Sequence, residues 1–465
     1  MASYKLLPPV SSRPGPVFAG DPSDKQIDRV LLGSLAEGGQ RRQLWLDISG
    51  EQVVGVLGKR GTGKSYTLGV LIEGLAGGAA ETAIARHKTA RGGLVFDIMD
   101  IFWSTQIPLS MSGSAEIKKQ HAAMVRGGMK PQDLAVDVWI PAGFEDPEID
   151  PRGVRTIRID PAALSIDDWG ALFDINIYSE PQGMLIADLI SHVCESGYET
   201  RDHPPILANT TYNLDDLLDC LDAAAFVANF SDSTVRAVRQ RLQSFARLEL
   251  FRGAPTPLSK LISAGRVSIL MLSRVPDQIK RVVVSVLLNQ ILRQRSAASF
   301  AQKRLDLQSD LSDGERRKLK NAIATRIPRT WVLMDEAHVL AGTGEGSVAR
   351  DAIIKYAKEG RNFGLSLAVA TQQPSALDSR LMSQVETMIV HQLTASKDAA
   401  VAAENLKSPS PESMKVDDVL SDMRGLLRRL SQGEAVFSCG NAPQLPRSCV
   451  LAVRPRISAH GGYEA

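Results

Sequence analysis

The sequence predicts an α/β protein in which a mostly parallel β-sheet, covered by helices on both faces, carries a phosphate-binding loop. Residues 58–65 match the pattern G-x-x-x-x-G-K-[ST], directly after the apolar run 53–57 and before apolar residues at helical spacing. Short apolar segments alternate with helical segments along the rest of the chain, which is typical of a buried parallel sheet. One such segment, residues 331–334, ends in the carboxylates Asp335 and Glu336. Together these observations indicate a nucleotide-binding core.

Length and composition are ordinary for a folded protein. The 465 residues suffice for two or three domains or for one large α/β domain with insertions. Hydrophobic residues make up 44% and charged residues 23%. The 54 basic and 52 acidic residues leave a net charge of +2, which excludes a uniformly cationic protein of the histone kind. Any contact with nucleic acid therefore requires positive charge gathered in one place.

Targeting and metal-binding signals are missing from the sequence. No apolar run approaches the length of a membrane span, and the first residues lack a hydrophobic signal core, so we expect a cytoplasmic protein without membrane contact. The four cysteines, Cys194, Cys220, Cys439 and Cys449, form no C-x-x-C pair, and the seven histidines show no metal-ligand spacing. This pattern suits a reducing compartment and argues against a structural zinc site.

Residues 1–48 are expected to form an arm and a short β element. Residues 1–26 are rich in proline, serine and glycine, which predicts a loose arm. Residues 29–33 and 43–47 predict two strands around a turn at 37–39, a hairpin that leads into the core.

The core is expected in two parts, residues 49–180 and 263–440, separated by a helical insertion at 181–262. Strand-like runs occur at 53–57, 92–98, 136–140, 155–159, 266–272, 331–334, 365–370, 387–390 and 434–437. Helical periodicity marks the insertion at 184–195, 214–228 and 233–248, and a long helix is predicted at about 278–295. The charged stretch 303–329 is interpreted either as a solvated helical excursion or as a basic element that faces DNA.

The phosphate loop predicts a site for ATP or GTP. Its glycines let backbone N–H groups surround phosphate oxygens, and the helix N-terminus adds its positive dipole. Lys64 is expected to reach the β and γ phosphates, and Ser65 to hold Mg²⁺. The predicted nucleotide-binding residues are Gly58, Lys59, Arg60, Gly61, Thr62, Gly63, Lys64, Ser65 and Tyr66.

The acidic strand end predicts hydrolysis of the nucleotide. Phosphoryl transfer depends on positioning and charge stabilisation. Asp335 is therefore expected at the magnesium shell, and Glu336 is expected to orient and deprotonate the attacking water. The alternative is an acidic strand terminus that caps a helix.

Two further polar residues flank the predicted strand at 365–370. Gln372 would place an amide beside the γ-phosphate, or else bond a turn at the strand end. Arg361 would act as an arginine finger in the site of a neighbouring subunit, or else form a surface salt bridge with Glu359 or a similar partner.

These motifs together resemble the HerA branch of the HerA/FtsK superfamily of hexameric DNA-pumping ATPases. The likeness rests on residues 57–67, 334–338, 359–364 and 370–374, and on a closing strand near 430–435. The resemblance implies a RecA-like core, a helical-bundle insertion and a ring of six subunits with ATP at their borders and duplex DNA in the channel. It also implies site roles for Lys64, Asp335, Glu336, Arg361 and Gln372, and a tail, 441–465, that packs on the ring neighbour.

The front of the chain departs from the family pattern. HerA proteins usually begin with a full β-barrel that docks a nuclease, whereas only about 50 residues precede the phosphate-loop strand here. The barrel is therefore expected to be reduced or absent. Compact HerA-like proteins resemble parts of bacterial antiviral systems, which implies a separate effector such as a nuclease or an NAD-degrading enzyme.

In a ring, six copies of one basic loop would line the channel although each subunit is nearly neutral. The candidate loops are 273–281, with Arg274, Lys280 and Arg281, and the glycine-rich 342–350, with Arg350. Each is otherwise a plain surface loop. Such a motor would contact the DNA backbone without reading bases.

Three functions remain open at this point. The leading hypothesis is an ATP-driven translocase or helicase acting on double-stranded DNA as a hexamer. The rival is a ring scaffold that binds ATP to organise a partner effector, with little translocation. A conjugation or secretion motor is weaker, because the sequence shows no membrane anchor.

Overall fold

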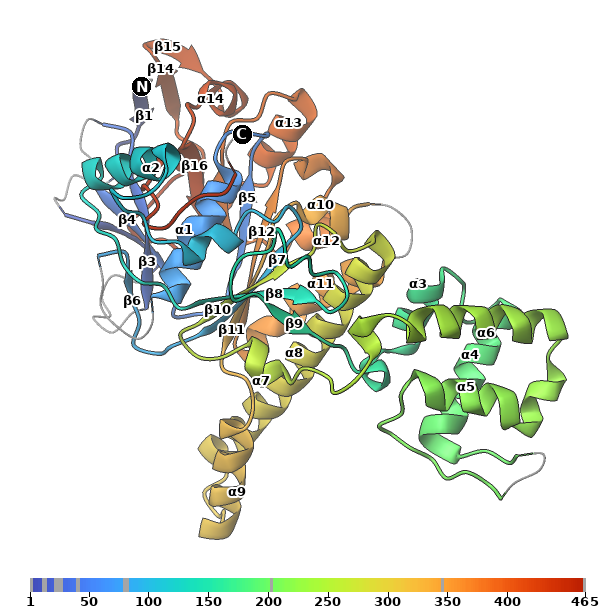
Figure 1. Cartoon of the computed structure of the whole chain (residues 1–465). Helices are drawn as coiled ribbons and strands as arrows, with labels where there is room; N and C mark the ends of the chain where they lie inside the picture. The colour runs from blue at the N-terminus through green and yellow to red at the C-terminus, as the bar shows by residue number, and fades with distance from the viewer. Residues whose placement is uncertain are drawn as a thin grey trace.

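The computed structural model describes residues 3–10, 15–20, 28–38, 42–77, 83–200, 204–343 and 347–462. Its centre is a 14-stranded sheet, surrounded by helices (Figure 1). Eight neighbouring strands run parallel, in the order β13 (Thr387–Val390), β5 (Val53–Leu57), β12 (Leu365–Thr371), β11 (Thr330–Met334), β7 (Gly92–Asp97), β10 (Val267–Met271), β8 (Val136–Pro141) and β9 (Arg155–Ile157). The predicted RecA-like α/β class with a mostly parallel sheet is confirmed.

Helices cover both faces of this sheet, which explains why its strands are continuously apolar. Every residue of β5, β7, β10, β11 and β12 is buried. In β5 the side chains alternate: Val54 and Val56 pack with α1 (Lys64–Ala76) in one apolar cluster. Val53 and Leu57 belong to the cluster that holds α8 (Asp277–Leu307) and α11 (Val348–Glu359). The phosphate-loop helix thus covers one face of the sheet, and α8 and α11 cover the other.

One edge of the sheet is mostly antiparallel and is built from both ends of the chain. Beyond β13 follow β16 (Glu434–Cys439), β17 (Cys449–Val453), β3 (Arg29–Leu35), β4 (Gln43–Asp47) and β2 (Val17–Ala19), and β6 (Ala85–Arg86) pairs with β3. The predicted hairpin therefore exists as β3 and β4, but it extends the central sheet, and the described residues form no barrel.

Both chain ends take part in sheets. Within residues 441–465, which the resemblance places on a ring neighbour, β17 lies inside the sheet of its own chain, paired with β16 and β3, and the packing on a neighbour stays a prediction. The loose arm is partly ordered, because β1 (Tyr4–Leu7) joins β14 (Ser413–Val416) and β15 (Val419–Ser421) in a separate three-stranded sheet. β1 pairs with β14, and β17 pairs with β3, each more than 400 positions away in the sequence. Local composition does not reveal such pairings.

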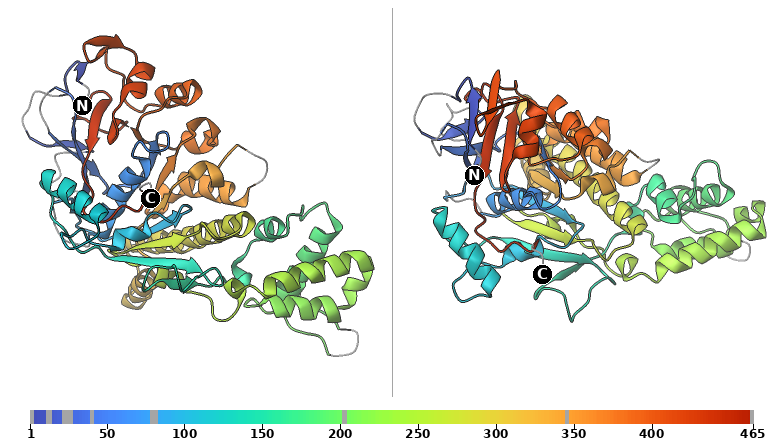
Figure 2. Two further views of the ribbon diagram at one scale, coloured as in Figure 1. Left: turned by 45° about the horizontal axis from the view of Figure 1, so that its top comes forward. Right: turned by 90° about the horizontal axis from the view of Figure 1, so that it is seen from above.

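The helices between residues 181 and 246 form a lobe that stands to one side of the sheet (Figure 2), whereas the short helix at Leu258–Leu261 lies beside α8 (Figure 1). Aromatic rings join the lobe to the preceding helix: Phe173 packs edge-on against Trp169 and stacks on Phe245, with ring centroids 5.7 and 5.3 Å apart. The helices of this region are α3 (Ile166–Phe173), α4 (Pro181–Ser191), α5 (Leu214–Ala223), α6 (Asp232–Ala246) and α7 (Leu258–Leu261).

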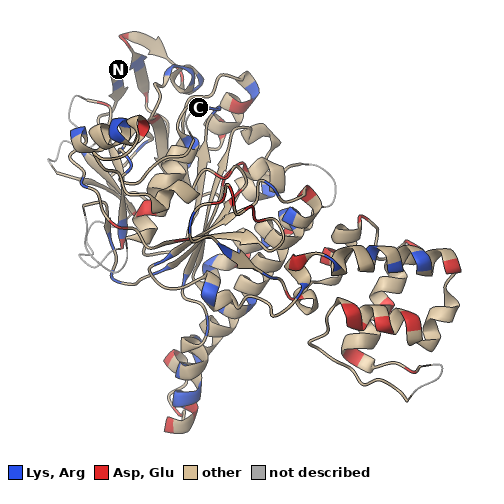
Figure 3. Cartoon of the chain, in the orientation of Figure 1, with Lys and Arg blue, Asp and Glu red and all other residues tan. Residues whose placement is uncertain are grey.

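The charged stretch 303–329 continues α8 and folds back as α9 (Asp313–Ala324), a two-helix arm that projects from the body. No residue of α9 is buried, and it carries both acidic residues, in its first turn, and basic residues after them (Figure 3). The remaining helices are α2 (Ala115–Arg126), α10 (Ala337–Leu340), α12 (Ser379–Met382), α13 (Ser396–Glu404) and α14 (Met423–Arg429). Among the described residues, no helix combines the length and apolarity needed to cross a membrane.

Candidate active site

The phosphate loop, residues 58–63, connects the end of β5 to the first turn of α1. Gly58 and Gly63 have φ values of 156° and 118°, which favour glycine at both positions. A Cβ on Gly58 would lie 2.6 Å from the Cβ of His391, so a side chain would not fit there. The loop is therefore held open by glycines against a buried histidine that follows β13.

Neighbouring loops hold the phosphate loop by its backbone. The Lys59 N–H donates to the Gln392 carbonyl at 2.9 Å, and the Gly433 N–H donates to the Thr62 carbonyl at 3.2 Å. The Gln432 side-chain amide donates to the Gly61 carbonyl at 3.1 Å. The segments after β13 and before β16 thus shape the loop. Sequence reasoning missed the first segment, which carries no motif, and included the second only as the closing strand near 430–435, without a role at the phosphate loop.

Lys64 offers a buried positive charge to this loop. The residue is 5% exposed, and its ammonium donates to the Lys59 carbonyl at 3.3 Å. Burial lowers the pKa of Lys64, while the negative charges of Glu336 and Asp335 counter part of that effect. An ammonium has three N–H donors, so a phosphate oxygen would satisfy the others.

Ser65 and Asp335 meet across the sheet edge. The Ser65 hydroxyl donates to Asp335 Oδ2 at 2.6 Å, and the Glu336 N–H donates to Asp335 Oδ1 at 2.8 Å. Burial raises the pKa of Asp335, against the hydrogen bond from Ser65 and the charge of Lys64. One hydroxyl and one carboxylate fit Mg²⁺, which binds few protein oxygens and completes its shell with phosphates and water. Among the described residues there is no cluster of three or more metal-ligating side chains.

Glu336 occupies a strained backbone position at the start of α10. Its φ of 47° is left-handed, which non-glycine residues rarely adopt, and its buried Oε2 has no hydrogen-bond partner among the described residues. Burial and the charge of Asp335 raise the pKa of Glu336, opposed by Lys64 and by a hydrogen bond from the Gln372 backbone. An unpaired oxygen on a strained residue is arranged for a ligand or a water molecule.

His338 and Gln372 lie next to the Glu336 carboxylate. His338 Nδ1 lies 3.4 Å from Glu336 Oε2 and 3.1 Å from the Thr371 hydroxyl. Burial and the neighbouring Lys64 lower the pKa of His338, so the ring is neutral near pH 7. Gln372 follows β12 directly and contacts Glu336 through its backbone. Sequence reasoning included Gln372 and missed His338, which follows the acidic pair by one residue.

Arg361 lies away from the site of its own chain. It belongs to a short 3₁₀ helix, Gly360–Phe363, that precedes β12, so it is at the opposite edge of the sheet from the phosphate loop. Its side chain is 71% exposed and donates from Nη1 to Glu386 Oε1 at 2.6 Å. The ion pair is therefore with Glu386 and not with Glu359.

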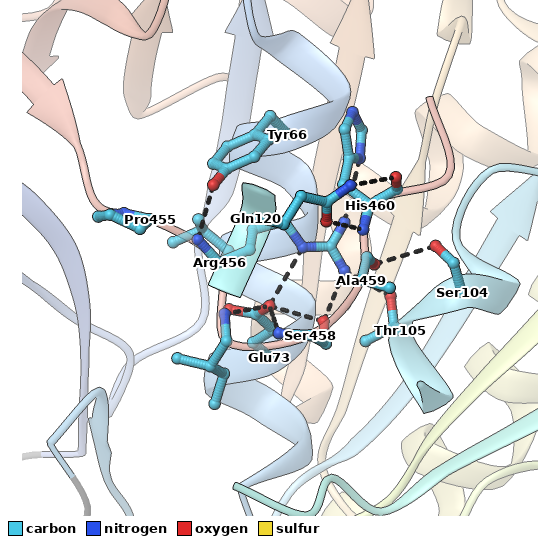
Figure 4. A network of polar contacts seen from close by, with 12 residues as sticks. Tyr66, Glu73, Ser104, Thr105, Gln120, Pro455, Arg456, Ser458, Ala459 and His460 are labelled. Carbon is cyan, nitrogen blue, oxygen red and sulfur yellow. Dashed lines mark hydrogen bonds and ion pairs between the residues drawn. The ribbon is translucent and has the colours of Figure 1, made fainter. Parts of the chain in front are cut away.

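Tyr66 does not face the phosphate loop. Its hydroxyl accepts a hydrogen bond from the Arg456 N–H at 2.7 Å, and its ring packs edge-on against His460 (Figure 4). The Tyr66 side chain therefore points away from the loop, and its expected nucleotide contact stays a prediction. Ser65 and Tyr66 are successive helical residues and point to different sides of α1.

Most of the basic residues proposed for DNA contact are paired within the chain. Arg274 forms an ion pair with Asp150. Lys280 is buried and lies 3.0 Å from Asp277, and Arg350 lies 3.8 Å from Asp378. Arg281 is exposed. Residues 344–346 of the second candidate loop lie outside the described residues.

The amino-acid sequence is similar to those of known proteins. The model of a protein family described as "Helicase HerA, central domain" matches residues 32–291, more than half of the chain. The DNA double-strand break repair helicase HerA of Pyrococcus furiosus is 29% identical over 218 residues, which cover 46% of this chain and 38% of that protein. The HerA of Sulfurisphaera tokodaii is 25% identical over 185 residues, 40% of this chain and 31% of that protein. The matched region thus spans less than two fifths of either relative.

A solved structure resembles nearly the whole chain. The structure of VirB4 of Thermoanaerobacter pseudethanolicus has a TM-score of 0.51 and 15% identity, and covers 93% of this chain and 97% of that one. At this identity the likeness concerns the fold alone.

Proposed function

Since the chain belongs to the family of HerA helicase central domains, we propose that it is an ATP-hydrolysing motor that moves along or unwinds double-stranded DNA. It acts as a ring of six subunits and works with a separate effector protein. The observation that carries the proposal is the meeting of Ser65 with Asp335, 2.6 Å apart, beside the buried Lys64 and the unpaired carboxylate oxygen of Glu336.

Each of these groups has a place in ATP hydrolysis. The loop N–H groups and Lys64 bind the phosphates, and Ser65 and Asp335 hold Mg²⁺, which when bound neutralises charge on the phosphate oxygens. Glu336 Oε2 accepts a hydrogen bond from water and takes its proton as the water oxygen attacks the γ-phosphorus, while the bond from the γ-phosphorus to the β–γ bridging oxygen breaks and ADP leaves. The raised pKa of Glu336, which burial causes, makes it a stronger base than an exposed glutamate.

The distribution of these groups over one chain supports a shared site. Arg361 is exposed at the edge of the sheet opposite its own phosphate loop. In a head-to-tail ring it would insert into the neighbouring site and stabilise charge on the transferring phosphoryl group. Gln372, beside Glu336, would then report the state of the γ-phosphate to β12.

DNA contact in the ring needs exposed positive charge. Of the four basic residues considered, Arg281 is exposed on α8, whereas Arg274, Lys280 and Arg350 would have to leave their carboxylate partners. Arg281 is therefore the first candidate for a backbone contact in the channel.

The effector is proposed to be a nuclease or an NAD-degrading enzyme of an antiviral or DNA-processing system. The N-terminal hairpin belongs to the central sheet of this chain. An effector that docks on the described residues would therefore meet a surface other than a separate barrel.

Hydrolysis of ATP by the purified ring, with and without linear duplex DNA, tests the proposal. We expect duplex DNA to increase the turnover, and particle images with ATP and DNA to show six subunits around the duplex. An assembled ring whose ATPase ignores DNA, and which supports a co-purified effector equally well as Glu336→Gln, would instead identify an ATP-assembled scaffold.

A further inference from the structure

A buried carboxylate lies in the middle of the phosphate-loop helix. Glu73 of α1 is fully buried. Its Oε1 accepts hydrogen bonds from Arg456 Nε at 3.1 Å, from the Ile457 and Ser458 N–H groups at 3.0 Å each, and from the Ser458 hydroxyl at 2.7 Å. Its Oε2 accepts from Arg454 Nη1 at 2.7 Å. Glu73 is therefore saturated by one segment, residues 454–460, which we call the tail strap (Figure 4).

The tail strap also binds a second part of the core. Arg456 Nη2 donates to the Thr105 hydroxyl at 2.7 Å, and the Ser104 hydroxyl donates to the Ala459 carbonyl at 3.0 Å. The Ala459 N–H donates to the Ile107 carbonyl at 2.9 Å, and His460 exchanges hydrogen bonds with Gln120 of α2. The strap thus links α1 to the segment that follows β7.

That segment leads to the acidic side of the candidate metal site. The carboxylate of Asp97, the last residue of β7, accepts hydrogen bonds from the N–H groups of Ile101 and Phe102 at 3.2 and 2.7 Å. β7 is the neighbour of β11, and the negative charge of Asp335 contributes to raising the pKa of Asp97. At one end the strap network contacts Tyr66, the residue after Ser65. At the other end it reaches the segment held by Asp97, whose strand lies next to the strand that leads to Asp335.

Stability alone gives no reason for such polar packing. Burying a carboxylate with two guanidinium groups costs desolvation, and apolar residues of similar volume often stabilise a fold as well or better. Such a network does fix the orientation of the strap and its distance from α1, because each polar group in it has one set of partners. Gly69 fits this role: a Cβ there would lie 2.5 Å from Arg456 Nη1, so the helix has no side chain where the guanidinium rests.

We propose that Arg456 and Glu73 are positioning residues that set α1, and with it Lys64 and Ser65, against the strand ends that carry Asp97 and Asp335. Through them the tail strap tunes how tightly the site binds ATP and Mg²⁺. This inference rests on the proposed ATPase activity. Glu336 is held by β11 and by the Gln372 backbone, which the strap contacts do not include. Disturbing the strap should therefore change binding more than the chemical step.

Two variants test the inference without leaving Glu73 unpaired. Arg456→Lys keeps the charge but has one donor group where the guanidinium reaches Glu73, Thr105 and Ser458. Gly69→Ala keeps every charged residue and pushes the guanidinium away from the helix. For both we expect the KM for ATP and the half-saturating Mg²⁺ concentration to rise about tenfold, with kcat changed about threefold or less.

Arg447→Lys is the matched control. Arg447 is equally buried and its Nη2 lies 2.7 Å from Glu37 Oε1, but this pair joins the tail to the N-terminal segment and has no described contact with α1. We expect Arg447→Lys to lower Tm about as much as Arg456→Lys and to leave the KM for ATP unchanged.

Binding of a fluorescent ATP analogue to each full-length variant, measured alongside turnover, separates the outcomes. The inference is overturned when Arg456→Lys and Gly69→Ala bind the analogue as tightly as the wild type, or when Arg447→Lys weakens binding equally. Wild-type protein that binds no ATP would overturn the proposed function as well. Wild-type binding with unaffected strap variants overturns only the role of the strap.

Discussion

The Ser65 hydroxyl lies 2.6 Å from Asp335 Oδ2, so a hydrogen bond joins the first turn of α1 to the end of β11 across 270 positions of the sequence. The two groups reach each other because β12 lies between β5 and β11, and all three strands end at the same edge of the sheet. A magnesium ion bound to ATP would take the place of the shared proton. The pair is thus the part of the site whose loss should be seen in the metal dependence.

Replacing Ser65 by alanine removes one proposed magnesium ligand and leaves Oδ2 of the buried Asp335 without the hydrogen bond from Ser65. We expect Ser65→Ala to raise the half-saturating Mg²⁺ concentration about tenfold or more, the effect of one charge-assisted contact. ATPase rates measured over a Mg²⁺ titration check this. Ser65→Thr retains the hydroxyl and serves as the control. Equal Mg²⁺ dependence of the alanine variant and the wild type would contradict the assignment.

Glu336→Gln keeps the shape of the side chain but removes the base. We expect ATP turnover to fall about 100-fold or more, while ATP still binds, because a positioned general base contributes about that factor. Single-turnover hydrolysis and equilibrium binding of an ATP analogue measure the two separately. Loss of binding together with turnover would show that Glu336 holds the nucleotide and does not activate water.

The acidic limb of the pH–rate profile should belong to Glu336. Burial and the neighbouring Asp335 raise its pKa above the usual 4.5. The base works only when deprotonated, so kcat should fall as the pH drops through this raised pKa and should be level above it. Measuring kcat from pH 5 to pH 8 with saturating ATP and Mg²⁺ checks the limb. A profile of Glu336→Gln with the same limb would assign it to another group.

Arg361→Ala should lower turnover without destabilising the fold. The exposed ion pair with Glu386 stabilises by about 1 kcal/mol or less, so the unfolding midpoint should barely move. If the arginine completes a neighbour's site, mixing Arg361→Ala with Lys64→Ala restores part of the activity. In mixed rings the phosphate loop of an Arg361→Ala subunit can then be completed by Arg361 of a neighbouring Lys64→Ala subunit. Glu386→Gln is the control, since it frees Arg361 and should retain turnover. No gain on mixing, with mixed rings demonstrated, would place Arg361 outside the site.

His391 should make the fold sensitive to acid. Burial lowers its pKa to about 4, whereas an unfolded histidine titrates near 6.5. The unfolded chain takes up this proton first, so the stabilisation present above pH 6.5 is lost as the pH falls toward 4. The loss at pH 5 is about 2 kcal/mol for this residue. Urea unfolding at pH 8 and pH 5 should show a smaller difference for His391→Gln than for the wild type; equal differences would contradict the prediction.

Local patterns in the sequence were sufficient for the parallel half of the fold. The runs that became β5, β7, β11 and β12 are mostly apolar and fully buried, and such strands can be predicted without knowledge of their neighbours. Lys64, Ser65 and Asp335 were placed correctly at one edge, because strand–loop–helix context fixes where a phosphate loop lies.

Non-local pairings were beyond the same reasoning. Glu73 and Arg456 lie 383 positions apart, and nothing near either residue indicates the other. Tyr66 was assigned to the nucleotide because it follows the motif, although its direction depends on which face of α1 the tail covers. The ion partners of Arg274 and Arg350 are likewise set by packing between distant segments. Charge in a sequence shows how many basic residues there are, but not which of them are already neutralised.

The position of β17 has a consequence for how the protein is made. This strand, residues 449–453, is hydrogen-bonded between β16 and β3, so in the sheet the early hairpin of β3 and β4 connects to the parallel strands only through it. Synthesis proceeds from the N-terminus, and long-range pairing is slow. The hairpin must therefore wait, with an open edge, until residue 453 has emerged from the ribosome. The tail strap follows directly behind, so the phosphate-loop helix is clamped only after β17 has been synthesised.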